Sequence, residues 1–148
     1  MTINHELVTR KLLLVISDLE PLGAIAAQGR SACSASEVNQ AVVERRLQRA
    51  IGRMIDINYH LLTASGHAPP ADYHASFVAL ADMGLLDREF VARVARAAGL
   101  GNRFVHDYDD LDPALVFEAL EAALLDIPRY LAAVNDGAKA IRRDPRRR

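Results

Sequence analysis

The sequence predicts an all-α protein: an antiparallel four-helix bundle with one extra short helix. Apolar residues recur at alternating spacings of three and four along several long stretches, which is the pattern of one helix face. No stretch alternates apolar and polar residues between turn signals, as a half-buried strand would. We expect residues 1–141 to form one helical bundle and residues 142–148, with five arginines, to form a flexible tail.

The first helix is expected from about residue 4 to residue 19. Pro21 lacks a backbone N–H, so it predicts a kink or a break at that point. Residues 29–35 have the composition of a loop, and this loop would contain the single cysteine, Cys33. The apolar face of the helix is formed by Val8, Leu12, Val15 and Leu19.

The second helix is expected to begin near Ser36 and to end before Gly66 and the two prolines at 69–70. Its apolar rows are wide, which suits a helix packed on two sides, within a bundle or across a dimer interface. Its polar face carries three arginines followed by an acid and a histidine: Arg46, Arg49, Arg53, Asp56 and His60.

Three more helices complete the prediction. A short one is expected over residues 71–83, and another begins after Asp87, with Gly99 and Gly101 expected to loosen or bend it. The pair Asp112-Pro113 is typical of a helix start, since an acid caps the first turn and proline fits the first helical position. Pro128 should kink this last helix.

Composition limits the possible functions. Hydrophobic residues make up 51% and charged residues 25% of the 148 residues, values typical of a globular domain. The formal net charge of -1 gives no overall attraction to nucleic acid, so such affinity needs local clustering. A single cysteine excludes internal disulfides, and no apolar stretch is long enough to cross a membrane. We therefore expect a cytoplasmic protein without membrane contact.

The candidate chemistry lies in residues 99–108, where His106 follows Asn102 and Arg103 at helical spacing. An imidazole can take or give a proton near neutral pH, and a guanidinium can bind a phosphate. Together these groups suit metal-independent RNA cleavage. The plainer interpretation is a histidine satisfied by a hydrogen bond, beside an exposed pair of Arg103 with Asp107.

We expect no cofactor and no metal site. His60, His67 and His74 are spaced by seven residues, but the series crosses a helix end and two prolines.

Three blocks of sequence carry a resemblance to a known family. Residues 102–108 read Asn-Arg-Phe-Val-His-Asp-Tyr and follow Ala-Ala-Gly-Leu, which resembles the signature of the HepT-like branch of the HEPN superfamily. The second helix, with residues 43–51 and 56–60, and the short-helix region, residues 69–86, are similar to the family in the same order.

The resemblance implies a homodimeric toxin that cleaves RNA, with His106 as acid or base and Asn102 and Arg103 beside it. It also implies a partner, a minimal nucleotidyltransferase that acts as antitoxin by transferring AMP to the motif tyrosine, here Tyr108. An added phosphate two residues from the imidazole would repel and block an RNA strand.

One position departs from the family pattern. Gly101 stands where the family has an arginine, which is expected to bind the scissile phosphate. Arg103 could replace that cation, or the second-helix row could supply it from Arg46, Arg49 or Arg53; the other interpretation of this row is a solvated helix face. If the row instead forms a wall of an RNA cleft, Asp56 and His60 at its end are expected to lie near the active site.

Two other functions stay open at this stage. One is a catalytically inactive helical subunit that binds a nucleotidyltransferase and serves as its substrate. The other is a structural dimeric bundle without chemistry at residues 99–108.

Overall fold

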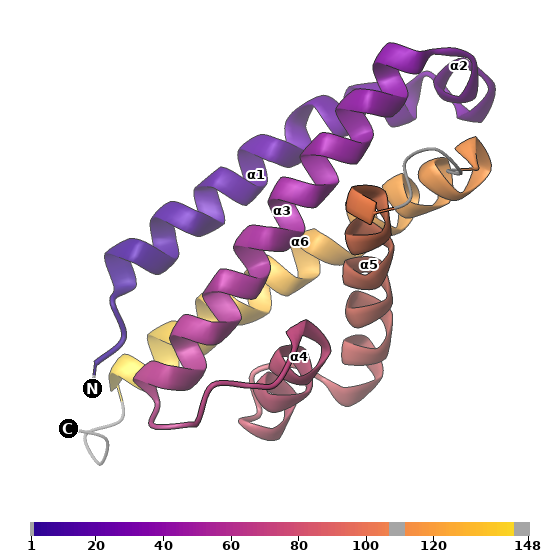
Figure 1. Cartoon of the computed structure of the whole chain (residues 1–148). Helices are drawn as coiled ribbons and strands as arrows, with labels where there is room; N and C mark the ends of the chain where they lie inside the picture. The colour runs from indigo at the N-terminus through magenta and orange to yellow at the C-terminus, as the bar shows by residue number, and fades with distance from the viewer. Residues whose placement is uncertain (1, 107–111, 144–148) are drawn as a thin grey trace.

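The computed structural model describes residues 2–106 and 112–143, and within these ranges every regular element is a helix. The three longest helices, α1 (His5–Ala27), α3 (Glu37–Ala64) and α6 (Pro113–Arg143), pack side by side along the molecule (Figure 1). α5 (Arg88–His106) crosses them, and the short helices are α2 (Arg30–Ala35) and α4 (Tyr73–Asp82). The predicted all-α bundle is confirmed, with one short helix more than expected.

The start of the chain differs from the prediction in two ways. α1 continues through Pro21 to Ala27, because Leu22 and Ile25 extend its buried face beyond the proline. The loop predicted over residues 29–35 is wrong, since most of this segment is α2. Cys33 in α2 is fully buried, which raises the pKa of its thiol and disfavours the reactive thiolate.

The other helix starts follow from capping. The Ser36 hydroxyl accepts a hydrogen bond from the Asn39 N–H at 3.1 Å, and α3 begins directly after it. Asp72 accepts the Ala75 N–H at 2.7 Å at the start of α4. Asp112 accepts the Ala114 N–H at 2.9 Å, so α6 begins at the predicted Asp-Pro pair. The starts at Ser36 and at Asp112-Pro113 are confirmed, whereas α4 begins at Tyr73, two residues after the expected position 71.

Neither glycines nor prolines interrupt the later helices. α5 continues past Gly99 and Gly101 to His106, held by an apolar face that is buried against its neighbours. α6 continues through Pro128 to Arg143, so its helix includes the first two residues of the predicted tail; residues 144–148 lie outside the described part. The buried face of α5 is formed by Phe90, Val91, Val94, Ala95 and Ala98.

A chain of polar groups crosses the apolar core. The Tyr130 hydroxyl of α6 is fully buried and lies 2.5 Å from Asn58 Oδ1 and 3.0 Å from the Met54 carbonyl, both on α3. The Asn58 amide donates to the Ser76 hydroxyl of α4 at 3.1 Å. Ser76 in turn donates to the Tyr73 carbonyl at 2.6 Å. Burial also raises the pKa of Tyr130, so it stays protonated and able to donate.

None of the helices within the described ranges combines the length and the low charge that a membrane crossing requires.

Removing the Tyr130 hydroxyl tests the buried chain. We expect Tyr130→Phe to lower the free energy of unfolding by about 1–3 kcal/mol, because Asn58 Oδ1 loses its donor in a water-excluded site. Urea denaturation measures this. The matched control is Tyr59→Phe, whose half-buried hydroxyl donates to the Pro70 carbonyl at 3.2 Å and should cost less. Equal losses in the two variants would contradict the role given to the chain.

Candidate active site on α5

The three predicted catalytic residues fall in the last turn and a half of α5. Asn102, Arg103 and His106 lie within the helix, whose spacing of three and four places these positions on one side. The predicted helical placement is therefore confirmed. The Arg103 side chain is exposed. The side chains of Asn102 and His106 lie outside the described part of the structure, as does Tyr108 altogether.

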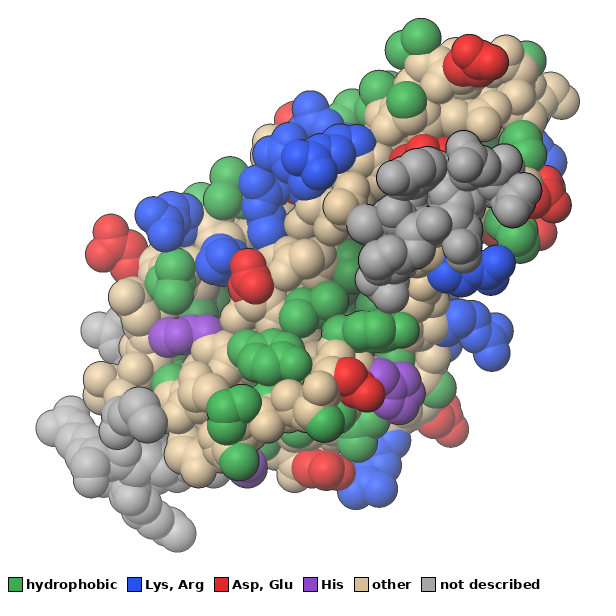
Figure 2. All heavy atoms as spheres, viewed as in Figure 1, with side chains coloured by type: hydrophobic (Ala, Val, Ile, Leu, Met, Phe, Trp, Pro, Cys, Tyr) green, Lys and Arg blue, Asp and Glu red, His purple; other side chains and the backbone are tan. Residues whose placement is uncertain are grey.

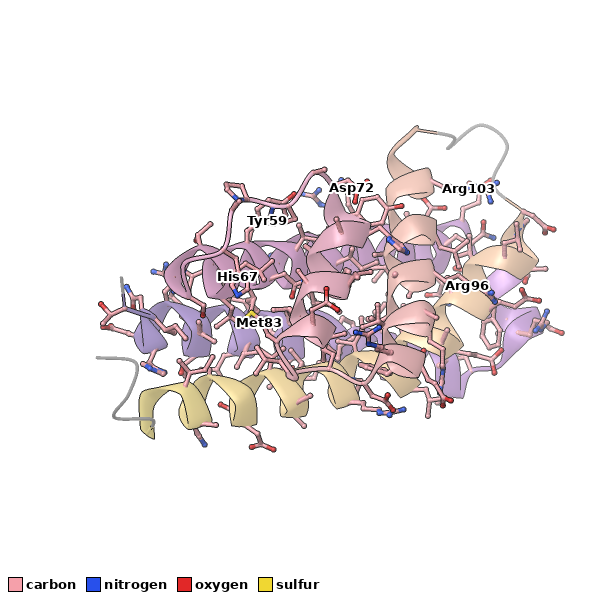
Figure 3. All side chains as sticks on the ribbon, turned by 90° about the horizontal axis from the view of Figure 1, so that it is seen from below. Tyr59, His67, Asp72, Met83, Arg96 and Arg103 are labelled. Carbon is pink, nitrogen blue, oxygen red and sulfur yellow. The ribbon has the colours of Figure 1, made fainter. Side chains whose placement is uncertain are left out.

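Arg103 borders an open groove between α4 and α5. The groove has a volume of about 490 Å³, and α5 contributes a row of positions that recur every three or four residues along the helix. Arg96 and Arg103 extend from α5 to the same side of that helix (Figure 3). The α5 lining consists of Ala92, Ala95, Arg96, Gly99, Leu100 and Arg103.

The other wall of the groove is the start of α4, where Tyr73 and His74 line it. Gly99 has no side chain between the two helices. A Cβ atom at this position would come within 3.3 Å of the Tyr73 hydroxyl oxygen, tighter than ordinary contact. Glycine at 99 thus lets the Tyr73 hydroxyl approach α5 closely.

The arginine row of the second helix surrounds one buried carboxylate. Asp18 of α1 is 1% exposed, and Arg46 Nη1 lies 3.1 Å from one of its oxygens. Arg49 Nε is 3.7 Å from the same oxygen, and Arg53 donates to the other. A cluster of Lys and Arg side chains over α1 and α3 is visible in Figure 2.

The contacts with Asp18 give the arginine row of α3 a structural role. The sequence alone suggested only RNA binding or a solvated helix face for this row. The three arginine side chains stay 20–40% exposed while they neutralise one carboxylate, so three positive charges against one negative leave the cluster cationic. The Asp18 carboxylate needs such partners, since a buried charge without them is costly. The arginines therefore join α1 to α3, and an RNA-binding role for them stays a prediction.

The expectation that Asp56 and His60 lie near the active site is wrong. The half of α3 that holds them lies beside the start of α1, away from the end of α5 (Figure 1). Asp56 pairs with Lys11 at 3.0 Å, and His60 Nε2 accepts the Asn4 N–H at 3.0 Å. Burial and the nearby His5 lower the pKa of His60, which keeps it neutral and able to accept.

A profile of the family described as Ribonuclease HepT-like matches residues 15–134, most of the chain. The chain belongs to the HepT-like family. It is 36% identical over 96 residues to the tRNA nuclease HepT of Aphanizomenon flos-aquae. That match spans 65% of this chain and 65% of the relative's length.

Solved structures share the HepT-like fold. One is a toxin–antitoxin crystal structure with AMP-PNP, with a TM-score of 0.79 and 22% identity, covering 86% of this chain and 97% of the other. A second is the tri-AMPylated Shewanella oneidensis HEPN toxin in complex with an MNT antitoxin. Its TM-score is 0.80 at 22% identity, and 88% of this chain and 97% of the other are covered.

Two features of this HepT-like chain escaped the sequence analysis. The pairing of Asp18 with the arginine row appears only in the structure, because burial of a carboxylate has no sequence signal of its own. The row of Ala92, Arg96, Gly99 and Arg103 was visible as helical spacing, yet its pairing with Tyr73 depends on how α4 packs. Among the side chains that the structure describes, which do not include that of His106, no three His, Cys, Asp or Glu gather closely enough to hold a metal ion.

Neutralising Asp18 tests the cluster in this HepT-like bundle. We expect Asp18→Asn to cost about 2–3 kcal/mol of unfolding free energy, below the roughly 3–5 kcal/mol of fully buried pairs, because the three arginines are partly exposed. The control is Asp56→Asn, whose side chain is 61% exposed and pairs only with Lys11, and which should cost about 1 kcal/mol or less. Urea denaturation that ranked both variants alike would refute the structural role of Asp18.

Proposed function

We propose that this HepT-like chain is a metal-independent endoribonuclease toxin that acts as a homodimer. The observation that carries the proposal is that α5 gathers Asn102, Arg103 and His106 at one end, beside an open cationic groove, in a chain of this family. The curated relative's name, a tRNA nuclease, supports RNA as the substrate class.

The chemistry assigned to these groups needs no cofactor. His106 takes the proton of a ribose 2′-hydroxyl, and that oxygen attacks the adjacent phosphorus. The bond from phosphorus to the 5′-oxygen of the next nucleotide breaks, and a protonated imidazole returns a proton to that oxygen. The products are a 2′,3′-cyclic phosphate and a 5′-hydroxyl. Asn102 lies one turn before His106 and is assigned to orient substrate.

Arg103 is the cation that we assign to the scissile phosphate in place of the arginine absent at Gly101. Its guanidinium is exposed at the groove and belongs to the same turn of helix as His106. Arg46, Arg49 and Arg53 are poorer candidates for this role, because they lie on α3 around Asp18, whereas Arg103 lies on α5, the helix that contains His106. Their surplus positive charge supports a weaker role, the attraction of an RNA backbone.

Control by a partner is the second part of the proposal. A minimal nucleotidyltransferase antitoxin would transfer AMP to Tyr108, with pyrophosphate leaving from ATP. The similar structures support it, since one contains AMP-PNP and another a toxin carrying AMP groups and bound to an MNT antitoxin.

The absence of an arginine at position 101 favours a second candidate function. In an inactive member, the same chain would bind the nucleotidyltransferase and accept AMP at Tyr108 without cutting RNA.

Cleavage assays separate the two candidates. With labelled tRNA, we expect His106→Ala to lower the cleavage rate by about 10²–10⁴-fold, the usual contribution of an acid–base group. Gly101→Arg should raise the rate, by up to about 10²-fold, if the missing guanidinium limits the reaction. Sedimentation of the same preparations tests the dimer. If neither the wild type nor Gly101→Arg cleaved RNA, the nuclease function would be refuted and the inactive subunit would remain as the candidate function.

Mass spectrometry tests the acceptor. After incubation with the cognate nucleotidyltransferase, ATP and Mg²⁺, we expect added AMP on the wild type and a loss of cleavage activity. Tyr108→Phe should gain no AMP and should stay active in the presence of the partner. The matched control is Tyr59→Phe, which keeps Tyr108 and should be modified. Modification of Tyr108→Phe would show that another residue is the acceptor.

A further inference from the structure

We propose that the groove between α4 and α5 binds the RNA strand beside the cleaved bond, with Arg96 and the Tyr73 hydroxyl as contacts to its sugar–phosphate backbone. The proposal rests on the nuclease function above and adds residues outside the family signature. It concerns the stretch of α5 that leads up to the candidate active site.

The described lining of the groove contains cationic and hydroxyl donors from both helices. None of its eight lining residues is acidic. Among the described residues, the Arg96 guanidinium makes no ion pair and the Tyr73 hydroxyl no hydrogen bond, although Arg96 is exposed and Tyr73 half-buried. Asp72, which directly precedes Tyr73, accepts the Ala75 N–H as the cap of α4. An anion entering the groove would therefore meet donors on both walls.

The spacing of the cations favours a chain of phosphates over a single anion. Arg96 and Arg103 are seven residues apart, which corresponds to two helical turns and roughly 10 Å along the axis of α5. One phosphate can engage one of these guanidiniums, whereas a polynucleotide can engage both at successive phosphates. The row continues in register to position 106, so a strand lying along it would lead to the candidate active site.

The floor of the groove leaves room for this strand. Gly99 lies between the two arginines along α5, where it admits the Tyr73 hydroxyl, and the small residues Ala92 and Ala95 precede Arg96 in the lining. A phenol hydroxyl there can donate to a phosphate or ribose oxygen, while His74 adds an imidazole to the lining. Such contacts position a strand without reading its sequence.

Binding can be measured apart from cleavage. The probe is a fluorescent single-stranded RNA, and the protein carries His106→Ala so that the RNA stays intact. In anisotropy titrations at several salt concentrations, we expect Arg96→Gln to weaken binding about 5–10-fold and to reduce the salt slope by about 0.7, the loss of one phosphate contact. Tyr73→Phe should weaken binding about 2–4-fold with an unchanged salt slope, because it removes no charge.

The matched control is Arg88→Gln on the same helix. It removes the same charge from an exposed side chain that lies outside the groove and pairs with Asp82 at 3.2 Å. Arg88→Gln should change RNA affinity less than twofold. Thermal melting confirms that each variant is folded.

Several outcomes would contradict the proposed RNA-binding role of the groove. Equal effects of Arg96→Gln and Arg88→Gln on RNA affinity would mean that only net charge matters. The absence of any RNA binding would refute RNA as the ligand of the groove. If Arg96→Gln weakened binding of the nucleotidyltransferase but not of RNA, the groove would be a protein-docking site. If RNA bound through Arg96 but was not cut by the wild type, the proposed nuclease function would be refuted, whereas the proposed RNA-binding role of the groove would stand.

Discussion

The buried hydrogen-bond chain from Tyr130 through Asn58 and Ser76 to the Tyr73 backbone sets the position of α4 relative to α3 and α6. Apolar packing alone would let such a short helix slide or rotate, since it has no directional preference. Buried hydrogen bonds are directional and costly to leave unmade, so they fix one arrangement. Tyr73 is both the last member of this chain and a wall of the α4–α5 groove. The shape of the candidate binding surface is therefore decided inside the core.

Much of the fold was predictable because local signals and burial agree. Ser36 and the Asp112-Pro113 pair mark helix starts by the chemistry of their own side chains, and the apolar rows of α3 and α6 face the core as their spacing predicted. The prediction failed at Pro21 and at residues 29–35. In both places local propensity argued against helix, and burial of Leu22, Ile25 and Cys33 outweighed it.

The candidate site was predictable only along one helix. Asn102, Arg103 and His106 are close in sequence, so helical spacing was enough to group them. Arg96 and Tyr73 come together only through the packing of α4 on α5, and no local pattern encodes that contact. The arginine row was visible, but the partner that gives it a structural role is 28 residues away in sequence, counted from Arg46 to Asp18.

The cationic cluster around Asp18 has a consequence for how a polyanion would meet this protein. The chain as a whole carries a formal charge of -1, so surplus positive charge on α3 and along α5 must be balanced by negative charge elsewhere. Segregated charge of this kind produces an oriented field although the sum is near zero. Such a field would turn an approaching polyanion before contact, and the resulting gain in association rate would decline as salt shortens the reach of the field.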